Sequence, residues 1–267
     1  MCRLVAYAGN TIPLGRLIDG PEHSLVVQSY RPREMRSGVV NADGFGVGWF
    51  PREVDEAPAL FTSPMPIWAD ANLPHLARAI QSACVFAAVR SATPGIPYGP
   101  EQVQPFKYGH YLFMHNGYIT HFRQRLMRRL RELLRDEFYV AIAGGSDSEH
   151  IFALWLEHLA QVGKGPSGMV EALQRTLTLL HRYAREAGSD ALLNLAMTDG
   201  RTLVTCRDTT TEYAPSLYIT TTDPFFADAV VVASEPLFAN DHWHAVLPGT
   251  VTVVGPALNV RTMRVEV

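Results

Sequence analysis

Cys2 is a candidate nucleophile, because it becomes the first residue of the chain once Met1 is removed, and its small side chain favours that removal. A free chain-terminal amine titrates close to neutral pH, which suits a general base. A processed Cys2 therefore carries a thiol and a base on one residue, and this pair can attack an amide carbonyl. A cysteine at the second position is also compatible with a residue that has no chemical role.

Arg90 and Thr93 form a second candidate group at the end of the apolar segment 84–90. A guanidinium binds a carboxylate through two parallel hydrogen bonds, and a hydroxyl group can add a third. The same residues also fit an ordinary surface arginine at the end of a strand.

Asn116 and Gly117 follow the apolar residues 111–114 and His115. The asparagine amide and the glycine N–H can both donate to one oxyanion, as hydrolysis of an amide requires. Asn-Gly is also the strongest short signal of a hairpin turn. The residues that follow become helical in pattern at about position 121, however, instead of returning as a strand.

Asp147 lies in the segment Ser146-Asp147-Ser148-Glu149. Ser146 and Glu149 have the spacing of a capping box, and an acidic residue in the first turn complements the helix dipole. Asp147 can also bind a substrate ammonium group. The two interpretations are compatible, because the cap would fix the direction of the Asp147 side chain.

The apolar patterns predict which elements carry these residues. Helical spacing is expected over residues 69–82, 121–137, 147–162 and 167–186, and loops over 51–65 and 93–100. A turn at 41–44 leads into a strand ending near 50, with glycines that permit close backbone approach. Further strands are expected at 3–8, 84–90, 110–115, 192–198, 203–206, 217–222, 229–233, 250–254 and 260–265.

Composition excludes several classes of protein. The 267 residues are 47% hydrophobic and 18% charged, with a formal net charge of −3, so nothing indicates a polyanionic partner. No apolar run reaches the roughly 20 residues of a membrane span, and the start is too short for a signal peptide. We therefore expect a cytoplasmic protein that binds neither nucleic acid nor membrane.

The remaining polar signals favour structural roles. Cys84 and Cys206 lie in strand-like segments as small core residues, so neither a disulfide framework nor a zinc site is expected. His242 and His244 flank a tryptophan without further ligands at metal spacing, so no metal is expected. The segment 121–137 carries Glu132, Asp136 and Glu137 besides its arginines, and this mixture indicates a solvated helix face. Asn194 is a polar residue within a strand and needs partners if it is buried.

The order of these signals resembles the class II glutamine amidotransferases of the N-terminal-nucleophile hydrolase superfamily: a terminal Cys2, then R-x-x-T, H-N-G and S-D-S-E. The resemblance spans at least residues 2–149. It implies an α+β fold, a four-layer αββα sandwich, in a single domain over residues 2–267. By the same resemblance, Cys2 is the nucleophile, and Asn116 with the Gly117 N–H forms the oxyanion hole. It also implies that Arg90, with Thr93, holds the α-carboxylate of a γ-glutamyl group, whereas Asp147 holds its α-amino group.

Among the small stand-alone members, the start Cys2-Arg3-Leu4 and the segments 41–46 and 90–95 look closest to the ergothioneine-pathway enzyme, which removes glutamate from γ-glutamyl-hercynylcysteine S-oxide. Pro94 stands where many synthase-linked members have His, which fits the stand-alone group. The resemblance implies an amidohydrolase that acts on a small γ-glutamyl substrate without a cofactor. Two alternatives stay open: a glutaminase subunit that feeds ammonia to a separate synthase, and a non-catalytic regulatory homologue. The sequence also leaves open a homo-oligomer.

Overall fold

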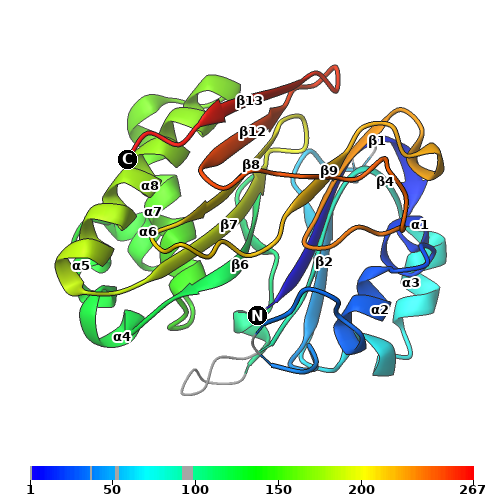
Figure 1. Ribbon diagram of the computed structural model, residues 1–267, viewed down its shortest axis with the longest axis horizontal. Helices are drawn as coiled ribbons and strands as arrows, with labels where there is room; N and C mark the ends of the chain where they lie inside the picture. The colour runs from blue at the N-terminus through cyan, green and yellow to red at the C-terminus, as the bar shows by residue number, and fades with distance from the viewer. Residues whose placement is uncertain (1, 37, 52–53, 92–98) are drawn as a thin grey trace.

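Two antiparallel sheets pack face to face, and helices cover the outer face of each (Figure 1). The computed structural model describes residues 2–36, 38–51, 54–91 and 99–267. Within these residues, one sheet has the strand order β11-β9-β10-β1-β4-β2-β3 and the other β13-β12-β8-β7-β6-β5. The predicted α+β class and the αββα layering are confirmed.

The first sheet is built around β1, which lies at its centre between β10 and β4. Its outer face is covered by α1 (Gly15–Ile18), α2 (Leu25–Tyr30) and α3 (Leu73–Ala79), which pack on the apolar side chains of β1 and β4. The strands are β1 (Arg3–Pro13), β2 (Phe45–Trp49), β3 (Ala59–Ser63), β4 (Gln81–Val89), β9 (Tyr218–Thr220), β10 (Ala229–Ala233) and β11 (His244–Ala245).

The second sheet carries two long helices, α7 (Asp147–Val162) and α8 (Pro166–Ala187), on its outer face. Three short helices, α4 (Phe122–Arg125), α5 (Met127–Arg131) and α6 (Asp136–Tyr139), connect β6 to α7. No helix in the described ranges combines the length and apolarity needed to cross a bilayer. The strands are β5 (Phe106–Tyr108), β6 (Tyr111–Ile119), β7 (Ala191–Thr198), β8 (Leu203–Thr209), β12 (Thr250–Val254) and β13 (Val260–Arg264), and 3-10 turns lie at Ile67–Ala69, Pro100–Gln102 and Pro224–Phe226.

Successive side chains of a strand point to opposite faces, and both faces of these sheets are buried. In β1, Leu4 and Ala6 enter the core between the sheets, whereas Val5 and Tyr7 pack beneath the helices. In β6, Met114 enters the same inter-sheet core. Cys2 lies two residues before Leu4, and Asn116 lies two residues after Met114. The alternation therefore places both on the faces that look toward the opposite sheet.

Several predicted elements differ from the structure. The predicted helix over 69–82 is shorter, because β4 already begins at Gln81. The predicted helix over 121–137 is divided into short helices, because the chain is interrupted at Leu126 and the extended backbone of Arg135 separates α5 from α6. The expected loop over 51–65 contains β3, and α1, α2, β5 and β11 were not predicted. These elements have two to six residues, which is too short for a periodic pattern to stand out.

The glycines of β2 allow the close backbone approach expected from the sequence. A Cβ atom on Gly46 would overlap the carbonyl oxygen of Gln104, and one on Gly48 would press on Leu112 of the second sheet. The segment that precedes β5 can therefore lie directly against β2.

Candidate active site

Cys2 and Arg90 lie at the same end of the first sheet. The pairing of β1 with β4 places Arg3, the first residue of β1, opposite Val89, the last residue of β4. Cys2 and Arg90, which adjoin them, therefore lie at the same end of the two strands. Arg90 is held there because its N–H donates to the Gly44 carbonyl at 2.8 Å. Cys2 is half-buried, and Arg90 is 8% exposed. Cys2 and Arg90 therefore extend from neighbouring strands at the same end of the sheet.

Asn116 approaches the same point from the second sheet. Its Nδ2 donates to the Ser234 hydroxyl at 3.1 Å, and this hydroxyl also accepts the N–H of Leu4 at 3.0 Å. Leu4 is only two residues from Cys2. One hydroxyl group therefore joins the asparagine amide to the start of β1 across the space between the sheets.

Gly117 lies inside β6, where it pairs with Leu193 of β7. The hairpin interpretation of Asn-Gly is therefore wrong, and β6 runs on to Ile119 instead of ending near residue 115. The glycine is required by packing, because a Cβ at this position would overlap the carbonyl oxygen of Leu192. The sequence indicated Gly117 as a site residue, but it could not show that Gly117 packs against the Leu192 carbonyl oxygen.

Asp147 is the first residue of α7, and its carboxylate is directed by backbone N–H groups. Oδ2 accepts from Ile119 at 2.7 Å, and Oδ1 accepts from Ser148 at 2.8 Å. The predicted capping box between Ser146 and Glu149 is present. The Ser148 hydroxyl also donates to Oδ1, at 3.3 Å. Since a carboxylate offers about four acceptor positions, one remains for another donor. The helix start is thereby anchored three residues beyond Asn116 in β6.

His115 and Gln104 were not singled out as site residues by the sequence, although both fix the position of Asn116. His115 is buried, with Nδ1 2.9 Å from the Ser148 hydroxyl and Nε2 2.9 Å from the Leu192 carbonyl oxygen. The Gln104 side chain accepts the His115 N–H at 2.5 Å and donates to its carbonyl at 3.0 Å. The histidine of the H-N-G triplet was the signal in the sequence that could have indicated this supporting role.

A buried ionic network supports the start of β1. Arg3 Nε lies 2.7 Å from Glu235 Oε1, and Arg3 Nη1 donates to the Cys2 carbonyl at 2.9 Å. Glu235 also contacts His23 Nε2 at 2.7 Å and accepts the N–H of Arg33 at 2.8 Å. Burial would raise the pKa of Glu235, but hydrogen bonds from His23 and the backbone, with the charge of Arg3, outweigh it and lower the pKa to about 2. Glu235 is thus a carboxylate that fixes the backbone beside Cys2.

A polar row crosses the second sheet from the site to its edge. Asn116 pairs with Asn194, Asn194 with Arg207, Arg207 with Thr250, and Thr250 with Arg264. Directly paired residues share a face, so all five lie on the face of Asn116. The buried Asn194 finds partners, as expected, by donating to the Pro215 carbonyl at 3.2 Å.

Arg207 in this row fixes the segment that crosses from β8 to the first sheet. It donates to the carbonyls of Ala214 at 3.1 Å, Pro215 at 2.7 Å and Val246 at 2.6 Å. Burial lowers the pKa of the Arg207 guanidinium, which offsets the effect of nearby acidic groups. Three buried carbonyls thereby receive a charged donor.

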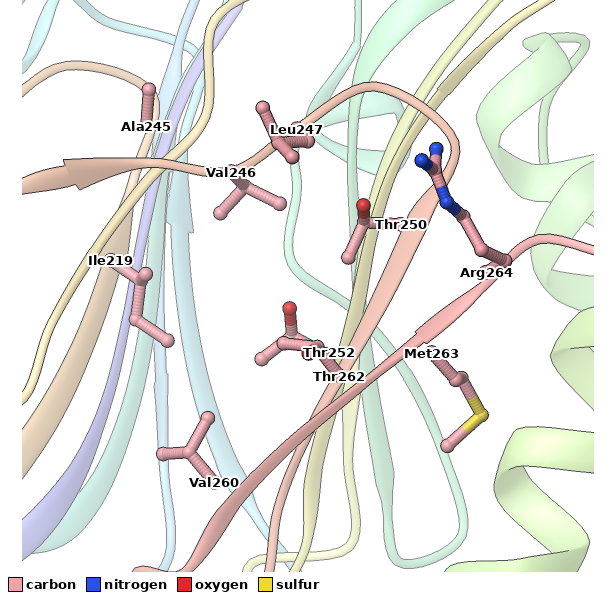
Figure 2. A pocket seen from close by; sticks show the side chains of 10 residues that line it. All are labelled: Ile219, Ala245, Val246, Leu247, Thr250, Thr252, Val260, Thr262, Met263 and Arg264. Atoms are coloured by element: carbon pink, nitrogen blue, oxygen red, sulfur yellow. The ribbon is translucent and has the colours of Figure 1, made fainter.

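An open hollow of about 390 Å³ lies at the far end of the polar row, between the edges of the two sheets (Figure 2). It is three strands away from β6, so it is separate from the site around Cys2. Its lining mixes apolar side chains with three threonines and one arginine: Ile219, Ala245, Val246, Leu247, Thr250, Thr252, Val260, Thr262, Met263 and Arg264.

Thr93 lies outside the described residues, so its predicted contact with a carboxylate stays a prediction. The described residues hold no group of three or more His, Cys, Asp or Glu side chains arranged for a metal ion. His242 contacts the Thr222 hydroxyl instead, at 3.1 Å. Cys84 and Cys206 are both buried, and burial raises the pKa of the Cys206 thiol well above its usual value.

Two stacked antiparallel sheets between helical layers, with a cysteine at the start of the central strand, define the class of N-terminal-nucleophile amidohydrolases. Residues 14–264 match the family described as "Glutamine amidotransferases class-II", and the chain belongs to this family of cysteine-dependent amidohydrolases. It is 33% identical to the "Probable glutamine amidotransferase DUG3" of Saccharomyces cerevisiae, over 95% of this chain and 82% of that protein.

Shorter matches link the chain to enzymes with a named substrate. The "Gamma-glutamyl-hercynylcysteine sulfoxide hydrolase" of Mycolicibacterium smegmatis is 45% identical over 120 residues, which is 45% of this chain and 52% of that protein. Among solved structures, a protein of Silicibacter pomeroyi described as "glutamine aminotransferase class-II domain protein" has a TM-score of 0.71 at 25% identity, covering 98% of this chain and 99% of that one. The glutamine phosphoribosylpyrophosphate amidotransferase of B. subtilis has a TM-score of 0.64 at 16% identity, covering 99% of this chain and 49% of that one, and this likeness supports the fold alone.

Proposed function

We propose that this protein hydrolyses the γ-glutamyl amide bond of a small conjugate and releases glutamate, with Cys2 as the nucleophile. The shorter matches, to hydrolases of γ-glutamyl-hercynylcysteine sulfoxide, make that compound the substrate to test first. We also propose that residues 2–267 form one domain, because contacts such as Asn116–Ser234 and Arg3–Glu235 join distant parts of the chain.

In the proposed reaction, the α-amine of Cys2 takes the thiol proton as sulfur attacks the γ-carbonyl carbon. The carbonyl oxygen becomes an oxyanion that accepts hydrogen bonds from Asn116 Nδ2 and the Gly117 N–H. The tetrahedral intermediate collapses, the C–N bond breaks, and the ammonium of Cys2 gives its proton to the leaving amine. Water then hydrolyses the thioester in a second round of the same steps and releases glutamate.

Two opposite charges would select the glutamyl end of the substrate. Arg90, with Thr93, would bind the α-carboxylate, and Asp147 would bind the α-ammonium group. Arg90 directly follows β4 at the end where Cys2 precedes β1, and Asp147 begins α7 and binds the backbone of Ile119, three residues beyond Asn116. A substrate without a free α-amino acid end would leave both charges without partners, which disfavours its binding.

The observation that supports this proposal best is the hydrogen bond of Asn116 to Ser234, which in turn binds the backbone N–H of Leu4. This hydroxyl holds a candidate oxyanion donor, Asn116 Nδ2, close to Leu4, which lies two residues after Cys2. Asn116 and Leu4 are more than a hundred residues apart in the sequence.

The test is a screen of γ-glutamyl compounds for glutamate release, on protein whose loss of Met1 is verified by intact mass. We expect release by the unsubstituted protein and none by Cys2→Ala. Cys84→Ala is the matched control, because Cys84 is buried between the sheets and should leave release unchanged. Full release by Cys2→Ala would contradict the proposal.

A second candidate function is a glutaminase subunit that supplies ammonia to a separate synthase. It is favoured by the name of the relative that matches most of the chain, the "Probable glutamine amidotransferase DUG3". Glutaminase activity that needs a co-purifying protein would support this function, whereas efficient turnover of a bulky γ-glutamyl conjugate by the protein alone would oppose it. A non-catalytic regulatory protein is the third candidate, and retention of Met1 on native protein would favour it, because a blocked amine cannot act as the base.

A further inference from the structure

Ser234 occupies a fully buried position where three segments meet. It directly follows β10, and its N–H donates to the Leu4 carbonyl at 3.0 Å, which extends the pairing of β10 with β1 by one residue. Its hydroxyl oxygen accepts the Leu4 N–H at 3.0 Å and Asn116 Nδ2 at 3.1 Å. The hydroxyl group is therefore bound to the start of β1 on one side and to β6 on the other.

The Asn116 side chain depends on this one contact for its orientation. Its Oδ1 is buried without a hydrogen-bond partner among the described residues, and the bond to Ser234 is the one that the described structure gives its Nδ2. A side-chain amide carries two N–H groups, so one remains after Ser234 is bound. An amide without the serine would be free to rotate and could present its oxygen, which repels an oxyanion.

We propose that Ser234 is a positioning residue that aims the oxyanion donor of Asn116. By accepting one N–H of the amide, it directs the other toward the carbonyl group that Cys2 attacks. The same hydroxyl binds the backbone of Leu4, two residues after Cys2. Ser234 Oγ therefore fixes the position of the oxyanion donor relative to the nucleophile. This inference rests on the proposed amidohydrolase function and adds a residue to its machinery.

The neighbouring residue keeps Ser234 itself in place. Glu235 is fully buried and binds Arg3, His23 and the backbone of Arg33. Ser234 therefore lies between a strand and an ionic anchor, so its hydroxyl has little freedom to follow a moving amide. Such a rigid support is what a preorganised oxyanion donor requires.

The decisive experiment is a double-mutant cycle on glutamate release, with L-glutamine and γ-glutamyl-p-nitroanilide as probes. Loss of an oxyanion donor lowers kcat by about 100- to 1,000-fold, and we expect Ser234→Ala to lower kcat by about 10- to 100-fold with little change in KM. In an Asn116→Ala background, Ser234→Ala should cause no further loss, because the residue acts through the amide. Independent, multiplying effects of the two substitutions would overturn the inference.

Ser82→Ala provides the matched control for lost packing. Ser82 is also a buried serine whose hydroxyl accepts two backbone N–H groups, at 3.3 and 3.2 Å, but it lies at the opposite end of β4. We expect this variant to lose stability and keep its kcat. If Ser234→Ala and Ser82→Ala behave alike, the positioning role is excluded while the amidohydrolase function stands.

A readout without turnover separates the two proposals. Nitrogen-15 NMR follows hydrogen exchange of the Asn116 side-chain amide, which should be faster in Ser234→Ala than in the unsubstituted protein and in Ser82→Ala. An amide that is equally protected in Ser234→Ala rejects the inference, even for an inactive protein. An unsubstituted protein that releases no glutamate rejects the proposed function.

Discussion

At the scale of single residues, a substitution of Arg90 tests most directly whether the protein binds a substrate carboxylate. Arg90→Lys keeps the positive charge but loses the planar fork that binds a carboxylate through two hydrogen bonds. We expect KM to rise by about tenfold or more, with a smaller change in kcat, since hydrogen bonds to charged groups contribute about 1.5–3 kcal/mol. The control is Arg128→Lys, whose side chain is 92% exposed beside Glu132. Equal kinetics for both variants would exclude Arg90 as the carboxylate ligand.

Glu235 should make the stability of the protein depend on acid pH. Its pKa is lowered from 4.5 to about 2 in the folded state, where the facing groups are Arg3, His23 and two backbone N–H groups. A pKa that is lower in the folded state than in the unfolded state stabilises the protein at pH values above the unfolded pKa. This contribution is therefore complete above pH 4.5 and is lost as the pH falls toward 2. Its size is at most about 3 kcal/mol.

Urea unfolding of the unsubstituted protein and of Glu235→Gln, between pH 7 and pH 3, measures this contribution. The substituted protein should be less stable at pH 7, because Arg3 stays buried without its carboxylate. The difference between the two proteins should shrink below pH 4.5. A difference that is independent of pH would show that Glu235 is not the titrating group.

At the scale of elements, the pairing of β6 with β7 leaves no room for a side chain at Gly117. In Gly117→Ala the new Cβ would meet the Leu192 carbonyl oxygen, which is backbone and cannot move aside. We expect a loss of about 1–3 kcal/mol in unfolding free energy. Gly145→Ala is the control, because a Cβ there meets nothing within 4 Å. Thermal unfolding that is unchanged in Gly117→Ala would contradict this packing.

Elements with a strong pattern were predicted from the sequence, and those decided by tertiary contacts were not. The helices α7 and α8 agree with prediction to within about one residue, because each has a long periodic apolar face, and α7 has its capping box. The Asn-Gly pair was expected to follow a strand but lies inside one, since the pairing with β7 overrides the local turn preference. Short elements such as α1 and β11 were not predicted, because they have too few residues to show a periodic apolar pattern.

The candidate site divides in the same way. The chemistry of the four candidates is visible in their residue types, so the sequence could name them before the structure was known: Cys2, Arg90, Asn116 and Asp147. Ser234 has no such signature, because its importance comes from a contact across 118 residues of sequence. A single sequence does not encode that contact in any local pattern.

At the scale of the whole molecule, Arg207 links the two sheets by binding the segment that crosses between them. Arg207→Lys replaces three hydrogen bonds, to Ala214, Pro215 and Val246, with a single ammonium group. We expect faster hydrogen exchange in residues 213–218 and around 246, measured by mass spectrometry, with α7 and α8 unaffected. The exposed Arg201→Lys should leave exchange unchanged. Unaltered protection in Arg207→Lys would refute this linking role.

The contact between Asn116 and Ser234 also has a consequence during synthesis on the ribosome. All six residues predicted from the sequence to form the site have been translated by residue 147, yet the hydroxyl that we propose to orient Asn116 arrives only with residue 234. A chain that ends before β10 would thus contain all six residues but lack both the Ser234 hydroxyl and the strand that pairs with β1 beside Cys2. Full hydrolase activity would therefore be expected only after translation has passed residue 234.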